Sequence, residues 1–245
     1  MRAVSALDPA QQGAVLARPY SVAASLIILT SFIVGVFYCL DALHSERRDR
    51  SILFWKSLPV SDLTTVLSKA SIPVVVLPLL IFAIVVAVQL IMLLLSTAVL
   101  LGSGLGAATL WTRLRLFQMS LVLLYGLTVH VLWYATIYGW LLLVSGWAGR
   151  TTFLWAVLPP LALYAVERIA FGTSFFASML KYRLTGAMAT AFAVKAQGRG
   201  TVVIDRLAQL DPVRFLSSPG LWIGLAGAAA FLATAVRLRR YREPI

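Results

Sequence analysis

The chain has 245 residues, of which 60% are hydrophobic and only 12% are charged, and its formal net charge is +12. A soluble domain carries roughly 25% charged residues, so this composition excludes an ordinary soluble protein and indicates a membrane protein. The basic residues cluster between apolar runs, as they do beside membrane spans near anionic headgroups. We therefore expect contact with membrane lipid and none with nucleic acid.

The first span is predicted at about 22–43, after an opening of twenty residues that lacks the long apolar centre of a signal peptide. About 20 apolar residues are needed to cross a hydrocarbon core of roughly 30 Å, and Val22 to Leu40 carries no charge. The single cysteine, Cys39, lies in this run, so a disulfide within the chain is excluded.

A short and strongly charged stretch, SERRDRSILFWKSLPVSD, follows at positions 45–62. Ser45 suits a helix N-cap, and Glu46 and Asp49 would lie in the first turn, where acidic groups favour the helix dipole. We predict a short helix at about 45–58, charged in its first half and aromatic in its second, and ended by the proline that follows. Ser61 and Asp62 are predicted to start the next helix.

Two interpretations of this short helix are open. It could lie at the membrane interface, with Phe54 and Trp55 at headgroup level and its arginines on lipid phosphates. It could instead dock on a protein. Acidic residues alternate with the arginines, which weakens attraction to anionic lipid and suits a specific protein partner better.

The second span is predicted as one long, tilted helix at about 74–101. Its middle, AVQLIMLLL, contains no glycine or proline, so a hairpin is not expected there. Pro73 and Pro78 mark its entry, and the glycine-rich GSGLG marks its exit.

Three further spans are predicted at about 116–147, 153–172 and 219–237. The last has a clear start, because SSPG puts Ser218 at the N-cap and Pro219 at the first helical position.

A long segment of mixed polar and apolar residues, 173–218, lies between the fourth and fifth spans. Apolar residues recur in it at every fourth position, which predicts an amphipathic helix at the membrane surface. These residues are Phe176, Leu180, Leu184, Met188 and Phe192. The sequence TVVIDRLAQLDP predicts a second short helix that stops before Asp211 and Pro212.

The basic residues predict the orientation. An odd number of spans puts the two ends of the chain on opposite sides. The lysines and arginines of the short connections are concentrated on the side of the 45–58 helix, Arg150 and the C-terminal tail. We expect this side to be cytoplasmic, segment 173–218 to be external, and the protein to be a multi-pass protein of the inner (plasma) membrane.

Motifs of catalysis are missing from the sequence. A phosphate-binding loop ends in Gly-Lys-Ser/Thr, and GSGLGAAT lacks the lysine. The two histidines, His44 and His130, have no ligand neighbour at helical spacing, so no metal site is predicted. We therefore expect no enzyme activity and no cofactor in this chain; an intramembrane hydrolase built on Ser103 and His130 is poorly supported.

A few polar and aromatic residues lie deep in the predicted spans, and they are candidates for a substrate path. Gln89 and His130 are expected to hydrogen-bond across helices, with substrate contact as the alternative. Tyr134 belongs to an aromatic row that either packs at an interface or lines a path. Glu167 and Arg168 are expected to reach the outer interface or to cap a neighbouring helix.

At this point three stretches carry a resemblance. LDALHSERRDRSILFWKSLPVSDLTTVLSK resembles the first cytoplasmic loop of permease subunits of ATP-binding-cassette exporters of the type-2 family. YGLTVHVLWYATIYGWLLLVS and FLWAVLPPLAL...ERIAFGTS also resemble that family. Together they cover most of residues 30–180. The first stretch is specific, whereas the other two are mostly hydrophobic.

The resemblance implies an all-helical membrane subunit of an exporter, which pairs with an identical or different second permease. The few charges and many aromatic residues within the spans favour an amphipathic or lipophilic substrate. ATP and Mg²⁺ would bind to a separate ATPase subunit, which docks on a cytoplasmic coupling helix. Carried over by position, the docking residues are Glu46, Arg47, Arg48, Asp49, Arg50, Phe54, Trp55 and Lys56.

One departure from the family concerns the start of the chain. The family has six spans, and its first span is missing from the five predicted here. ALDPAQQGAVLARPY, at 6–20, resembles the external loop that follows that span. Either the start is truncated or misassigned, or the subunit has five spans. The alternative function is a membrane scaffold or sensor that recruits a cytosolic partner through the 45–58 helix.

Overall fold

The structure is a computed structural model that describes residues 9–51, 54, 57, 59–102, 111, 116–192 and 210–241. Its elements are α2 (Pro9–Asp41), α3 (His44–Arg48), α5 (Asp62–Ser71), the π-helix η1 (Ile72–Val76), α6 (Leu77–Gly102), α8 (Leu116–Trp147), α9 (Thr152–Phe171), α10 (Phe175–Ala191), α11 (Pro212–Leu216) and α12 (Pro219–Tyr241). Within these ranges five helices are long and apolar enough to cross a membrane, so the predicted all-helical bundle with five spans is confirmed.

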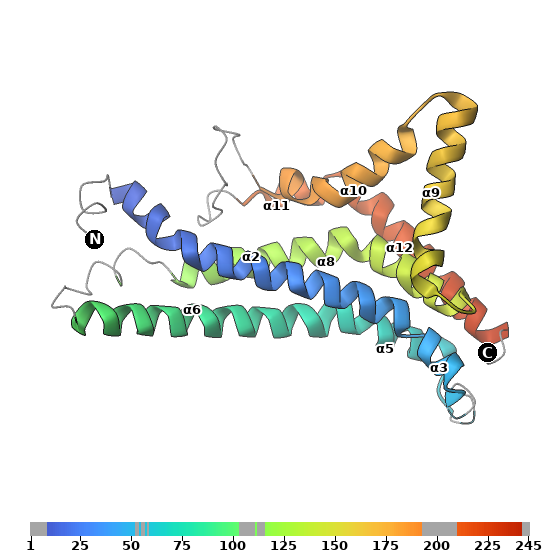
Figure 1. The fold of residues 1–245 in the computed structure, drawn as a ribbon, viewed down its shortest axis with the longest axis horizontal. Coiled ribbons are helices and arrows are strands. Elements are labelled where there is room, and N and C mark those ends of the chain that lie inside the picture. Colours follow the sequence, from blue (N-terminus) through green and yellow to red (C-terminus); the bar gives the residue numbers. More distant parts are fainter. Residues whose placement is uncertain are drawn as a thin grey trace.

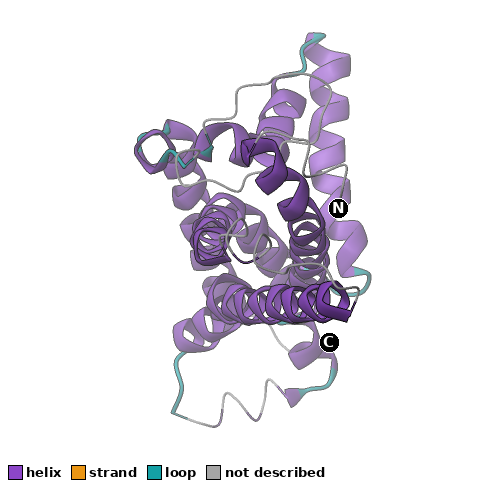
Figure 2. Cartoon of the chain, turned by 90° about the vertical axis from the view of Figure 1, so that its left-hand side faces the viewer, coloured by secondary structure: helices purple, strands orange, loops and turns teal. Residues whose placement is uncertain are grey.

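Helix α8 is the centre of the bundle. It packs against α2, α6, α10 and α12, and α2, α6 and α8 run side by side along the long axis of the molecule (Figure 1). Figure 2 shows the same bundle turned by 90°. Helix α9 projects away from the bundle, and only Ala156 of its side chains is buried. The start of α2 and the end of α12 lie at opposite ends of the molecule (Figure 1).

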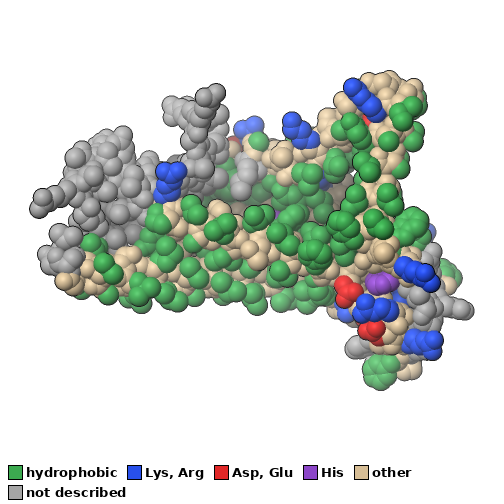
Figure 3. Space-filling view, viewed as in Figure 1, with side chains coloured by type: hydrophobic (Ala, Val, Ile, Leu, Met, Phe, Trp, Pro, Cys, Tyr) green, Lys and Arg blue, Asp and Glu red, His purple; other side chains and the backbone are tan. Residues whose placement is uncertain are grey.

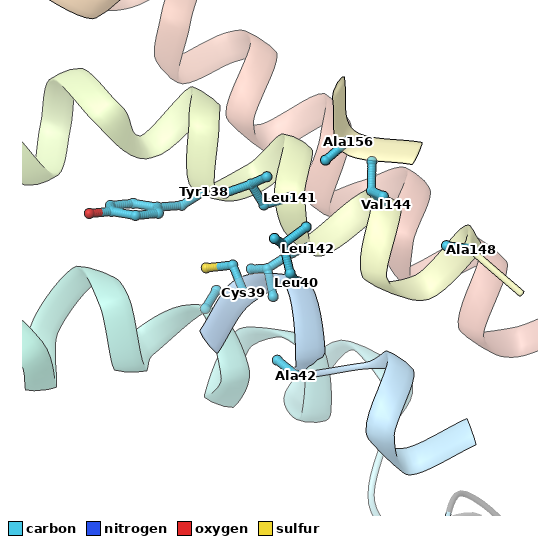
Figure 4. Packing of buried hydrophobic residues seen from close by; sticks show 10 residues of the cluster. Cys39, Leu40, Ala42, Tyr138, Leu141, Leu142, Val144, Ala148 and Ala156 are labelled. Atoms are coloured by element: carbon cyan, nitrogen blue, oxygen red, sulfur yellow. The ribbon is translucent and has the colours of Figure 1, made fainter. Parts of the chain in front are cut away.

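A compact apolar cluster holds the end of α2 against α8. Cys39 and Leu40 of α2 meet Tyr138 and Leu142 of α8 (Figure 4), and all four side chains are almost fully buried. Ala156 adds α9 to the same cluster. The chain leaves this cluster directly into α3, so the position of α3 is fixed from its first residue.

Helices α8 and α12 approach each other very closely. A Cβ atom added at Gly139 would lie 3.2 Å from both the Cα and the carbonyl oxygen of Ala228. Small residues permit such contact between helix backbones, which is the usual basis of tight packing between membrane helices.

The second span is one helical rod without a hairpin, as predicted, but it begins much earlier than 74. Ser61 caps α5, accepting a hydrogen bond from the Thr64 N–H at 3.1 Å. Pro73 does not end the rod. The chain forms the π turn η1 instead, in which the Leu77 N–H bonds to the Ile72 carbonyl five residues back. A wider turn is one of the ways in which a helix accommodates a proline.

The start of the chain also differs from the prediction. The expected external loop at 6–20 is helical from Pro9 onward, and Pro19 lies inside α2. Ala17 and Tyr20 are buried in a cluster with Leu93 of α6 and Met119 of α8. These tertiary contacts keep the helix intact through a residue that, by itself, favours a break.

The segment after α9 contains the predicted helix, now α10, and Leu180 and Leu184 of its apolar stripe do not pack inside the bundle, whereas Phe192 does. Leu180 and Leu184 are 39% and 46% exposed, whereas Gly186 and Ala187 are buried. A Cβ atom at Gly186 would lie 2.9 Å from the Trp133 ring, so glycine allows the close approach of α10 to α8.

The second predicted helix of this segment falls at 201–209, outside the described residues. Asp211 and Pro212 begin a helix, α11. The Asp211 carboxylate accepts a hydrogen bond from the Arg214 N–H at 3.0 Å, and Pro212 takes the first helical position. Proline suits that position because its missing N–H would have no helical partner.

Candidate functional site: the charged end of the bundle

Helix α3 is shorter than the predicted helix at 45–58. It ends at Arg48, and Arg50 adopts a left-handed backbone conformation with φ of 58°. Residues 51, 54 and 57 are helical again, beyond this break. A left-handed residue ends many helices, but it is usually glycine, so the sequence carried no signal for this stop.

The N-terminus of α3 is capped by another helix rather than by Ser45. The Ser145 hydroxyl of α8 accepts hydrogen bonds from the Leu43 and His44 N–H groups, each at 2.9 Å. Ser145 is fully buried. The first N–H groups of a helix need such acceptors, and here one hydroxyl from α8 serves two of them.

Glu46 is buried at the junction of three helices. Its carboxylate pairs with Lys69 of α5, with 3.1 Å between Nζ and Oε1, and with Arg239 of α12. The Arg239 Nε lies 3.3 Å from Oδ1 of Asp62, at the start of α5. Arg239 is therefore flanked by two carboxylates. These four side chains, Glu46, Asp62, Lys69 and Arg239, form what we call the inner charge cluster.

Arg47 fastens α3 to α8. Its Nη1 donates to the carbonyl oxygens of Gly146 at 3.1 Å and Ala148 at 3.2 Å, at the end of α8. The His44 Nδ1 lies 3.3 Å from the same Ala148 oxygen. Carbonyls at a helix C-terminus lack helical partners and carry negative partial charge, so a buried guanidinium is favourable there.

The predicted docking residues therefore separate into two groups. Glu46 and Arg47 are 6% and 8% exposed, so they face this chain's own helices and not a partner's surface. Arg48, Asp49 and Arg50 are exposed, and we call them the α3 tip. Arg48 and Asp49 form an ion pair at 3.2 Å, with both side chains 61% exposed.

The aromatic half of the predicted docking helix is described only in part. Phe54 is 61% exposed. Trp55 and Lys56 lie outside the described residues. Charged side chains of both signs gather around α3, in contrast to the apolar surface along the rest of the bundle (Figure 3).

Of the three candidate substrate-path residues, the structure brings two together. The rings of His130 and Tyr134 lie 4.6 Å apart, and the His130 Nε2 lies 3.1 Å from the Tyr138 hydroxyl. Phe32 of α2 packs edge-on against His130. Gln89 lies on α6, on the buried stripe between Val85 and Leu93. Among the described residues no hydrogen bond links Gln89 to the aromatic group.

Sequence reasoning missed the partners that hold α3 in place. Lys69 and Arg239 counted only as basic residues beside the membrane, and Ser145 carried no signal in an apolar run. The one available hint was the requirement that a buried carboxylate be paired. That requirement does not name the partner, because Glu46 and Arg239 are 193 positions apart.

No family model matches the chain, and neither a curated protein nor a solved structure matches it. The described helices make it a polytopic membrane protein. The resemblance to exporter permeases therefore stays a prediction.

Proposed function

We propose that the chain is the transmembrane subunit of an ATP-binding-cassette exporter, which moves an amphipathic or lipophilic substrate outward with ATP hydrolysed by a separate ATPase subunit. One observation supports this most strongly. Helix α3 is tied to three membrane helices on its inner side and exposes a group of charges at its tip.

The ties of α3 meet the requirement for transmitting force. Glu46 connects it to α5 and α12, and Arg47 connects it to the end of α8. Breaking a buried ion pair costs about 3–5 kcal/mol, so a displacement of α3 moves these helices with it rather than detaching from them. Alternating access needs such a rigid lever on a helix bundle that has two packings.

The α3 tip is suited to a protein partner. Arg48, Asp49 and Arg50 present both signs of charge in a small area, which favours a specific complementary surface. Arg50 holds a left-handed conformation that costs a non-glycine residue about 1–3 kcal/mol. Retention of arginine where glycine would be unstrained supports a role for the guanidinium itself.

The proposal places the α3 tip and the C-terminal tail in the cytoplasm, ATP and Mg²⁺ on the ATPase, and a second permease, identical or different, beside this chain. Asp49→Cys and Lys181→Cys test the orientation, because both positions are exposed and lie on the two opposite sides. A membrane-impermeant thiol reagent added to intact cells should label only the second variant. Labelling of Asp49→Cys alone would reverse the orientation, and labelling of both would contradict the placement of the two positions on opposite sides.

The deciding experiment is co-expression with a P-loop ATPase from an adjacent reading frame, whose presence would itself favour the transporter. The purified complex should hydrolyse ATP faster than the ATPase alone. Arg48→Glu combined with Arg50→Glu should abolish assembly and stimulation, because it reverses the charge of the α3 tip. Lys181→Glu, an exposed charge reversal on α10, is the matched control and should change neither.

Three results would count against the proposal. Unchanged assembly in the double variant removes the docking role of the α3 tip. Failure of the wild-type chain to bind any such ATPase removes the transporter assignment. A complex that forms without stimulation of ATP hydrolysis favours the scaffold or sensor.

A further inference from the structure

Arg183 of α10 inserts its guanidinium between α8 and α12, far along the bundle from α3. Its Nη1 donates to the Gly220 carbonyl at 3.0 Å, and its Nη2 donates to the Thr136 hydroxyl. The guanidinium carbon lies 5.1 Å from the centre of the Trp133 ring. Arg183 is only partly buried.

The partners of this cation in the described ranges are a carbonyl, a hydroxyl and an aromatic ring. In the described part of the chain, no carboxylate forms an ion pair with Arg183, and its hydrogen-bond acceptors are a carbonyl and a hydroxyl. The Glu167 carboxylate accepts hydrogen bonds from the Phe175 and Phe176 N–H groups at the start of α10 instead. The one carboxylate near the start of α10 is therefore bound to backbone N–H groups and not to Arg183 in the described structure.

The start of α12 adds positive potential beside the guanidinium. Gly220 belongs to the first turn of α12, where the helix dipole has its positive end. Desolvation lowers the pKa of the Arg183 guanidinium from its ordinary value, because burial disfavours the charge. An anion bound there would offset both effects.

The guanidinium also has donors to spare. It carries five N–H groups in a planar fork, and its two hydrogen bonds within the chain use two of them. The fork matches the oxygens of a phosphate, which it binds through two parallel bonds. Exposed apolar side chains on the same helix, Leu180 and Leu184, provide a surface for an acyl chain beside it.

We propose that Arg183, with Trp133, Thr136 and Gly220, forms an anion site that takes the phosphate group of a lipid-like molecule or of a free phosphate ester. As a substrate contact this site rests on the proposed function, and it would name phosphate-bearing amphiphiles as the substrate class. As an anion site it stands alone, because it needs no ATPase.

Binding can be measured on the purified chain in detergent. The melting temperature is recorded with added phosphatidylglycerol, with phosphatidylcholine, and with inorganic phosphate at constant ionic strength, and the apparent affinity is taken from the titration. Arg183→Gln should weaken binding about tenfold or more, since a charge-assisted hydrogen bond is lost. Lys181→Gln removes an exposed cation from the same helix and should bind like the wild type.

A pair of glycine variants tests the site without deleting the charge. A Cβ atom at Gly224 would overlap the Arg183 guanidinium, whereas one at Gly227 would make an ordinary contact of 3.6 Å with Thr136. Alanine favours a helix over glycine at both positions. Gly224→Ala should therefore weaken phosphate binding, and Gly227→Ala should leave it unchanged. This pair decides the question if Arg183→Gln does not fold.

The outcomes separate the ligand sources and the alternative role. A response to phosphatidylglycerol but not to inorganic phosphate supports a lipid headgroup as the ligand, and a response to both supports a site for free phosphate as well. A purely structural Arg183 lowers the melting temperature of Arg183→Gln but leaves the ligand-induced increase intact. That result, or an increase unaffected by Gly224→Ala, overturns the proposal whether or not an ATPase partner exists.

Discussion

The two ends of this bundle differ in the partners of their arginines. Arg239, in the inner charge cluster, is 6% exposed and lies between the carboxylates of Glu46 and Asp62. Arg183, near the start of α12, lies between a carbonyl, a hydroxyl and an indole ring. A buried cation with its anions built in locks helices together. A cation with only neutral partners can still attract an anion from another molecule. An arginine therefore has different physical roles at the two ends of the bundle.

The comparison is tested most severely at Glu46. Glu46→Gln keeps the shape of the side chain but leaves Arg239 and Lys69 without one of their anions. Loss of one partner of a buried pair costs about 3–5 kcal/mol. We expect that decrease in the free energy of unfolding, measured in mixed micelles. A decrease below about 1 kcal/mol would mean that the inner charge cluster does not lock the helices.

Ser145 gives the next largest effect at the same end. Ser145→Ala removes the acceptor of two N–H groups, and an unsatisfied buried donor costs about 1–3 kcal/mol. The same unfolding measurement should detect this loss. Ser68→Ala, which removes an exposed hydroxyl from α5, is the control and should change stability by less than about 0.5 kcal/mol. Equal effects of the two variants would refute the capping role.

At the other end, Arg183→Met should cost less than Glu46→Gln. It removes two hydrogen bonds from a charged donor, worth about 1.5–3 kcal/mol each, but it also removes the cost of desolvating the guanidinium and leaves no carboxylate of the described residues unpaired. We expect a decrease of about 1–2 kcal/mol in the same unfolding assay. A decrease as large as that of Glu46→Gln would show that Arg183 has an anionic partner in the chain and would end the contrast between the two arginines.

The smallest effect is expected at the α3 tip. Asp49→Asn breaks an ion pair in which both side chains are well exposed, and such pairs contribute about 0–1 kcal/mol. Thermal melting should change little, and less still at high salt, because the pair is screened. A large destabilisation would indicate that the tip is part of the locked structure and is not available to a partner.

The span pattern was predictable because the bilayer imposes a length of about 20 apolar residues, and charge-free runs of that length are visible in the chain. Helix ends were predictable only where the chain carries its own cap, as at Ser61 and Pro219. The ends of α3 were not predictable. Its N-terminus is capped by Ser145 of another helix, and its C-terminus is followed by Arg50, which is left-handed although it is not a glycine.

The location of the candidate site was predictable, but which of its charged residues face the bundle and which are exposed was not. The mixed charges at 45–50 singled out the correct segment as unusual in an apolar chain. Which of them turn inward depends on the rotation of a helix of five residues, too short for a periodic pattern. Arg183 was hidden for a related reason: its apolar neighbours at four-residue spacing suggested a face that proves to be exposed.

The π turn at Ile72–Val76 has a mechanical consequence for the rod between α3 and the outer end of α6. A π turn holds one residue more than an α turn, and each residue corresponds to about 100° of helix rotation. If the surplus residue moves along the rod, α5 turns about its axis relative to α6, and neither helix has to unwind. Lys69 pairs with Glu46 and lies on α5 just before this turn, so under the proposed function a pull on Glu46 would twist the membrane span. Spin labels at Leu67 and Leu79, both exposed, would report that twist as a change in their separation, and a fixed separation under load would exclude it.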